Sequence, residues 1–178
     1  MSTHSTRTRH ETGLRSDRTR HRGYAPKGRT PVVAVPARRT SLSILPAITN
    51  HGKVCFFIFK GALKPATLVS FMRRLTRDTP RKVFLILDNL NVHKAAKVRA
   101  WLQPRAAQIE VFFLPPYSPE LNPDEYLNGD LKRAVYSDIP APDQPALHRQ
   151  ALGHLRRIQK SPARVAAYFE HPAIRYAA

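Results

Sequence analysis

The apolar residues of the chain fall into short runs separated by turn-forming stretches, and their spacing predicts an order of strands and helices. Residues 32–35, 41–49 and 53–60 are rich in residues that favour strands, and an Asn-His-Gly turn signal lies at 50–52. We therefore expect an antiparallel meander over this part of the chain.

Helical spacing and apolar runs alternate after the meander. Apolar residues recur at helical spacing within residues 65–79, 95–102 and 147–158, which predicts three amphipathic helices. Residues 83–87 form an unbroken apolar run, typical of a strand covered on both faces, and residues 109–114 form a second short strand. This order predicts an α/β fold, a mixed sheet flanked by helices.

One further helix has a strong start signal. The segment 115–121 holds three prolines, which exclude regular structure there. It is followed by Asn122 as the N-cap, Pro123 at the first helical position, and Asp124 and Glu125 in the first turn. We expect a helix to begin at this point.

The beginning of the chain lacks such a pattern. Residues 1–30 are rich in Arg, Thr, His and Gly without apolar periodicity, so we assign residues 1–22 to a basic disordered arm and 23–178 to one folded domain. The chain has 30 Lys and Arg against 12 Asp and Glu, a net charge of +18. Such a field attracts polyanions and makes nucleic acid the expected partner. For the arm alone, a solvated basic tail without a defined role is the alternative.

Membrane insertion and export are not indicated by the sequence. The longest fully apolar run near the middle, residues 54–59, is far shorter than the roughly 20 residues that span a bilayer. The first residues lack the apolar stretch of a secretory signal. Cys55 is the only cysteine, which excludes an internal disulfide and fits the cytoplasm.

Two carboxylates lie where a sheet flanked by helices binds its ligands. Asp88 closes the buried strand 83–87 and Glu125 opens a helix. Converging carboxylates can hold two Mg²⁺ ions beside a scissile phosphate. Structural alternatives stay open, since Asp88 could accept hydrogen bonds from the following turn and Glu125 could cap its helix. Spacing also does not separate Glu125 from Asp124.

Two long motifs resemble a known family. LDNLNVH at 87–93 and LPPYSPELNPDEYLNGDLK at 114–132 closely resemble the catalytic core of bacterial insertion-sequence transposases, of the insertion sequence six-thirty type, in the mariner-related DDE superfamily. The sequence similarity to this family extends from GYAPKGRTPVV at 23–33 to YFEHPAIRYAA at 168–178. The resemblance implies an RNase H-like catalytic domain over 23–178 in the bacterial cytoplasm. It also implies Mg²⁺-dependent cleavage of transposon ends, with Mn²⁺ as an alternative ion, strand transfer into target DNA, and a homodimer that pairs two ends.

The resemblance gives roles to individual residues. Asp88 matches the family's second catalytic carboxylate and Glu125 its third, so both are implied to be catalytic and to bind the metal. His93 matches a histidine that often follows the strand-end aspartate. For His93 we weigh a hydrogen bond to the backbone above contact with metal or DNA.

The chain departs from the family at the first carboxylate. Where the family has Asp-Glu-Ser/Thr-Gly at the end of its first strand, this chain has His10, Glu11, Thr12 and Gly13. Residues 1–9 contain no apolar run for that strand, and no helix-turn-helix region precedes it. We therefore expect a missing or degenerate first strand, a truncated start and impaired catalysis. A non-catalytic, basic nucleic-acid-binding remnant is the alternative function.

Overall fold

The computed structural model describes residues 5–9, 12–17, 26–29, 39–116, 118–137 and 140–177. Its strands are β1 (Ser5–Arg9), β2 (Thr12–Arg15), β3 (Ser41–Thr49), β4 (Val54–Phe59), β5 (Val83–Leu87) and β6 (Ile109–Phe113). Its α-helices are α1 (Pro65–Arg77), α2 (Ala96–Leu102), α3 (Asp124–Ser137), α4 (Gln144–Gln159) and α5 (Pro162–Ala167). Short 3₁₀ helices are η1 (Asn91–Lys94), η2 (Gln103–Arg105), η3 (Pro119–Leu121) and η4 (Pro172–Ala177).

All six strands belong to one mixed sheet. Strand β3 pairs antiparallel with β4 along one edge and with both β1 and β2 along the other. Strand β1 then pairs parallel with β5, and β5 parallel with β6. The carboxyl ends of β1, β5 and β6 therefore meet at the same edge of the sheet.

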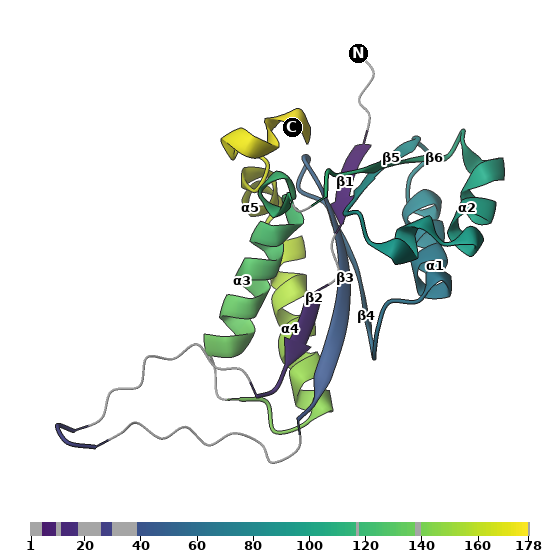
Figure 1. Cartoon of the computed structure of the whole chain (residues 1–178). Coiled ribbons are helices and arrows are strands. Elements are labelled where there is room, and N and C mark those ends of the chain that lie inside the picture. Colours follow the sequence, from purple (N-terminus) through teal and green to yellow (C-terminus); the bar gives the residue numbers. More distant parts are fainter. Residues whose placement is uncertain are drawn as a thin grey trace.

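Helices cover the two faces of this sheet, with α1 and α2 on one side and α3, α4 and α5 on the other (Figure 1). Alternate residues of β3 point to opposite faces. Leu45 packs with the buried residues of α1 and α2, whereas Ile44 and Ile48 pack with those of α3, α4 and α5. The core is thus two apolar layers separated by the sheet.

The strands and helices after residue 40 largely match the sequence expectations. The β3–β4 meander, β5 and β6 lie within a residue or so of the expected bounds, and α1 is two residues shorter than predicted. Helix α3 begins where its cap signal predicts, because the Asn122 side chain accepts a hydrogen bond of 3.1 Å from the Asp124 backbone N–H. The strand expected at 32–35 lies outside the described residues.

Of the expectation that the first strand is missing or degenerate, the first part is wrong, because a strand is present. Strand β1 lies at the centre of the sheet, with Arg7 opposite Thr49 of β3 and opposite Leu85 of β5. Backbone pairing on both sides, with two β-branched threonines in Ser-Thr-Arg-Thr-Arg, replaces the apolar run that the prediction required. The expected disordered arm at residues 1–22 therefore contains regular structure, since both β1 and β2 lie within it.

Strands β1 and β2 share one register along β3. Thr8 faces Ile48, and Thr12, four residues further on, faces Ile44, four residues back. The two strands thus run along β3 without an offset. His10 and Glu11, which separate them in the sequence, lie outside the described residues.

Candidate active site

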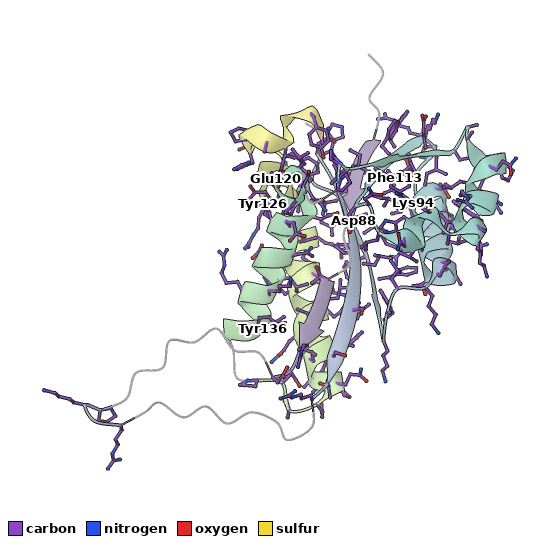
Figure 2. The ribbon with its side chains drawn as sticks, in the orientation of Figure 1. Asp88, Lys94, Phe113, Glu120, Tyr126 and Tyr136 are labelled. Carbon is purple, nitrogen blue, oxygen red and sulfur yellow. The ribbon has the colours of Figure 1, made fainter. Side chains whose placement is uncertain are left out.

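Asp88 and Glu125 come together at the edge where the parallel strands end. Asp88 directly follows β5, Glu125 lies in the first turn of α3, and both line one hollow of about 450 Å³. Figure 2 shows Asp88 near the middle of the molecule, between the α3 side with Tyr126 and the opposite side with Lys94. The rest of the lining consists of Asn89, Leu90, Leu114, Pro115, Pro116, Ser118, Pro119 and Asn122.

The position of Asp88 is fixed by the buried strand before it. Leu85 and Leu87 of β5 are fully buried, and pairing of β5 with β6 continues past the strand ends through a 2.8 Å bond from Leu114 N–H to the Leu87 carbonyl. The next residue can turn its side chain toward the edge of the sheet. Strand burial therefore anchors a half-buried carboxylate, 18% exposed, beside the hollow.

His93 contacts both the backbone and the side chain of Asp88. Its ring is buried, and Nδ1 lies 2.8 Å from the Asp88 backbone carbonyl and 3.0 Å from the carboxylate Oδ1. Both of these atoms are acceptors, so Nδ1 carries the hydrogen. The expected hydrogen bond from His93 to the backbone is confirmed, and the same nitrogen also contacts the carboxylate. Such a contact orients a carboxylate toward its ligand.

The turn formed by the proline-rich segment positions Glu125 beside the hollow. Helix η3 turns the chain through bonds from Leu121 N–H to the Ser118 carbonyl at 3.2 Å and from Asn122 N–H to the Pro119 carbonyl at 3.0 Å. Tyr176 of η4 donates a 2.7 Å hydrogen bond to the Leu121 carbonyl. The C-terminal 3₁₀ helix thus braces this turn, a role for which the sequence offered no local signal.

Burial separates the two acids at the start of α3. Asp124 is completely buried, whereas Glu125 is half-buried and lines the hollow. Asp124 acts on a nearby tyrosine instead: partial desolvation, followed by the charge of Asp124, raises the pKa of Tyr176 to about 12. Of the two acids, only Glu125 has access to a ligand shared with Asp88.

The donor set fits a hard divalent cation in part. Asp88 and Glu125 supply carboxylate oxygens, the ligands that Mg²⁺ prefers. Within the residues that the structure describes, however, no group of three or more His, Cys, Asp or Glu side chains is placed to hold a metal. Arg9 and Leu87 form the last pair between β1 and β5, and the next residues in the sequence are His10 and Asp88. His10 thus follows β1 in the sequence as Asp88 follows β5.

Comparison with known proteins places the chain in a family. The model of the DDE superfamily endonuclease family matches residues 8–148. A comparison with curated proteins gave no match.

Several solved structures share the fold. The mariner Mos1 paired end complex with Mg aligns over 98% of this chain and 56% of its own, with a TM-score of 0.68 and 16% identity. The Mos1 strand transfer complex aligns over 94% and 54%, with a TM-score of 0.65 and 20% identity. The catalytic domain of Mos1 mariner transposase aligns over 92% and 83%, with a TM-score of 0.53 and 19% identity.

The present chain therefore spans about half the length of the Mos1 chains in the two complexes. At these identities the similarity establishes the fold, which is that of an RNase H-like catalytic domain, as the sequence resemblance implied. The family model covers most of the chain, including Asp88 and Glu125. The chain belongs to the DDE superfamily endonuclease family.

Proposed function

We propose that the chain is the catalytic domain of a DNA transposase of the insertion-sequence type, which cleaves transposon ends and transfers them into target DNA. The observation that carries this proposal is the convergence of Asp88 and Glu125, from separate elements, on one hollow at the carboxyl ends of the parallel strands. Family membership supports the reaction class.

Asp88 and Glu125 would hold Mg²⁺, or Mn²⁺ in its place. The bound ion supplies positive charge that stabilises the phosphoryl group during in-line attack. The chain's own residues prepare the site: His93 orients Asp88, and the Asn122 cap fixes the helix turn that carries Glu125. DNA is the proposed substrate, and pairing of two transposon ends would call for two copies of the chain.

We further propose that catalysis is impaired because His10 replaces the first carboxylate. An imidazole has no negatively charged form in this range, so the cation would have one anionic ligand fewer than with a carboxylate. The alternative function, DNA binding without catalysis, is favoured by the same substitution and by the net charge of +18.

Nicking of supercoiled DNA in the presence of Mg²⁺ or Mn²⁺ tests the proposal. We expect slow nicking by the unmodified chain and at least a ~10²-fold loss in both Asp88→Asn and Glu125→Gln, because each removes a charged ligand. Calorimetric titration with Mn²⁺ should show weaker binding to both variants.

Two exposed carboxylates provide matched controls. Asp78 lies beyond the end of α1, and Glu120 lies in the proline-rich segment but does not line the hollow. The variants Asp78→Asn and Glu120→Gln should nick DNA and bind Mn²⁺ like the unmodified chain. Nicking that survives both Asp88→Asn and Glu125→Gln would overturn the catalytic assignment. DNA binding without nicking under all conditions would favour the alternative.

A further inference from the structure

The outer surface of α4 carries a run of cations without acidic neighbours. The helix has 16 residues and no carboxylate within its bounds. Arg149, Arg156 and Arg157 are exposed on it, and Lys160 follows at its end. A surface this one-sided repels itself, and an anionic partner would relieve that repulsion.

The described carboxylates do not neutralise these cations. None of the four takes part in an ion pair within the part of the chain that the structure describes, although Arg157 lies 3.5 Å from His154 Nδ1. The acids that do pair with Arg or Lys, at Asp17, Asp78, Glu110 and Asp130, pair with other cations. The charge on α4 therefore faces solvent.

A hollow of about 220 Å³ lies between α3 and α4 beneath this surface. Arg149 and Arg157 flank it, Gly153 lies between them one turn from each, and Ala134 and His154 form part of the wall. It is several times the ~30 Å³ that a water molecule occupies in the liquid. Two guanidinium groups thus border a space that can admit an anion.

Gly153 keeps this space open at a cost to the helix. Glycine is among the least favourable residues in a helix interior. A Cβ atom at this position would meet nothing within 4 Å, so close packing does not explain the glycine. Its lack of a side chain leaves the gap between Arg149 and Arg157 free.

The floor of the hollow is not strongly negative. His154 Nε2 lies 3.5 Å from the Asp130 carboxylate, but Arg164 and Tyr168 already contact the two Asp130 oxygens at 2.6 Å each. The nearest acid is therefore compensated from the far side. An incoming anion meets the two arginines rather than a free carboxylate.

We propose that the hollow between α3 and α4 binds a backbone phosphate of DNA between Arg149 and Arg157, at a surface separate from the Asp88–Glu125 hollow. Ala134 is nine residues after Glu125 on α3, two and a half turns, so the two face opposite sides of the helix. The DNA segment bound here is then not the one at the carboxylates. The inference rests on the proposed function only in taking DNA as the partner.

The length of the charged run fits an extended polyanion. From Arg149 to Lys160 the helix rises by about 16 Å. Over that distance a DNA strand presents about five phosphates at ~3.4 Å of rise each. Regularly spaced anions can therefore contact several cations of this surface at once.

Gly153→Glu tests the proposal without weakening the fold. The new carboxylate would lie between Arg149 and Arg157 and pair with both at helical i, i+4 spacing, while removing an unfavourable glycine. We expect the melting temperature to rise by about 2–4 °C. Affinity for a short DNA duplex, measured by fluorescence anisotropy in EDTA at about 0.1 M salt, should fall by about tenfold.

The salt dependence gives the decisive readout. Between about 50 and 200 mM salt, the slope of log K against log salt should become shallower by about one in Gly153→Glu, and also in Arg149→Gln. Ala100→Glu, an equal charge change at an exposed position of α2 on the opposite face of the sheet, serves as the control. It should keep the slope of the unmodified chain and lose less than about twofold in affinity.

An unchanged slope in Gly153→Glu would overturn the inference, as would an equal loss in Ala100→Glu. Failure of the catalytic proposal is detected separately, by nicking that does not depend on Asp88 and Glu125. DNA binding at the α3–α4 hollow does not require either carboxylate.

Discussion

At the scale of single residues, the proposed loss of the first carboxylate at position 10 can be tested by one substitution. We predict that His10→Asp increases nicking in Mg²⁺ by on the order of 10²-fold, because it would supply the carboxylate that we propose is lost at this position. The rate of plasmid nicking measures the effect. Glu11→Asp is the control and should change nothing; a gain of the same size there would contradict a specific role for position 10.

A second residue, Asp130, joins three helices. Its Oδ1 lies 2.6 Å from Arg164 of α5, its Oδ2 accepts a 2.6 Å hydrogen bond from the Tyr168 hydroxyl, and His154 of α4 lies 3.5 Å away. Asp130 is 9% exposed. Burial, followed by the hydrogen bond to Asp130, raises the pKa of Tyr168 to about 12. The carboxylate thus fixes α3 against the helices that follow it.

Removal of this carboxylate should destabilise the fold. We expect Asp130→Ala to lower the free energy of unfolding by about 2–4 kcal/mol, since it removes a buried carboxylate that accepts hydrogen bonds from both Tyr168 and Arg164. Urea denaturation measures the change. Asp78→Ala, which removes an exposed partner of Arg74 and Arg77, should cost at most about 1 kcal/mol. Equal losses in the two variants would argue against the network.

His154 should make stability depend on pH. Burial lowers the pKa of His154 below its ordinary value, despite the opposing charge of Asp130. As the pH falls through about 6.5, the unfolded chain takes up a proton that the folded chain resists, so stability present at neutral pH is lost on acidification. His154→Gln should therefore lose less stability between about pH 7 and pH 5.5 than the unmodified chain, as measured by urea midpoints. A parallel pH dependence in both proteins would contradict this.

At the scale of elements, the β3–β4 turn packs closely against the start of α5 at Gly52. Its φ is +81°, and an added Cβ would come within 2.4 Å of the Pro162 carbonyl oxygen. We predict that Gly52→Ala lowers the free energy of unfolding by about 3 kcal/mol or more, from backbone strain plus a backbone clash. Gly61 has a φ of +76° but open space around it, so Gly61→Ala should cost only about 1–2 kcal/mol. Chemical denaturation distinguishes the two.

Elements with a strong local pattern could be predicted from the sequence, and those held by their neighbours could not. The apolar run of β5 and the Asn-Pro cap of α3 each carry their own signal, so Asp88 and Glu125 could be placed at element ends. Strand β1 has no apolar pattern, because pairing with β3 and β5 holds it in the sheet. The contacts of Asp88 with His93, and of Tyr176 with Leu121, depend on how distant turns pack.

At the scale of the whole molecule, the two proposed ligand surfaces lie on different sides of the same helix. The N-terminal turn of α3 carries Glu125 beside the strand ends, whereas its C-terminal half borders the α3–α4 hollow with Ala134 and Val135. Displacement of α3 would thus disturb both surfaces, which makes the Asp130 contacts important to each.

Among the described helices, none is long and apolar enough to cross a membrane.

The central place of β1 also has a consequence for the order of folding. Strand β1 pairs with a strand that leaves the ribosome well after it, since Ser5 lies opposite Val83. At about 5–20 residues per second, β1 waits on the order of 4–16 s for β5. Polar Ser, Thr and Arg are well suited to that interval, because an apolar strand left without its partner would promote aggregation. The composition that leaves this strand without a hydrophobic pattern thus also limits the apolar surface that the chain exposes before β5 is made.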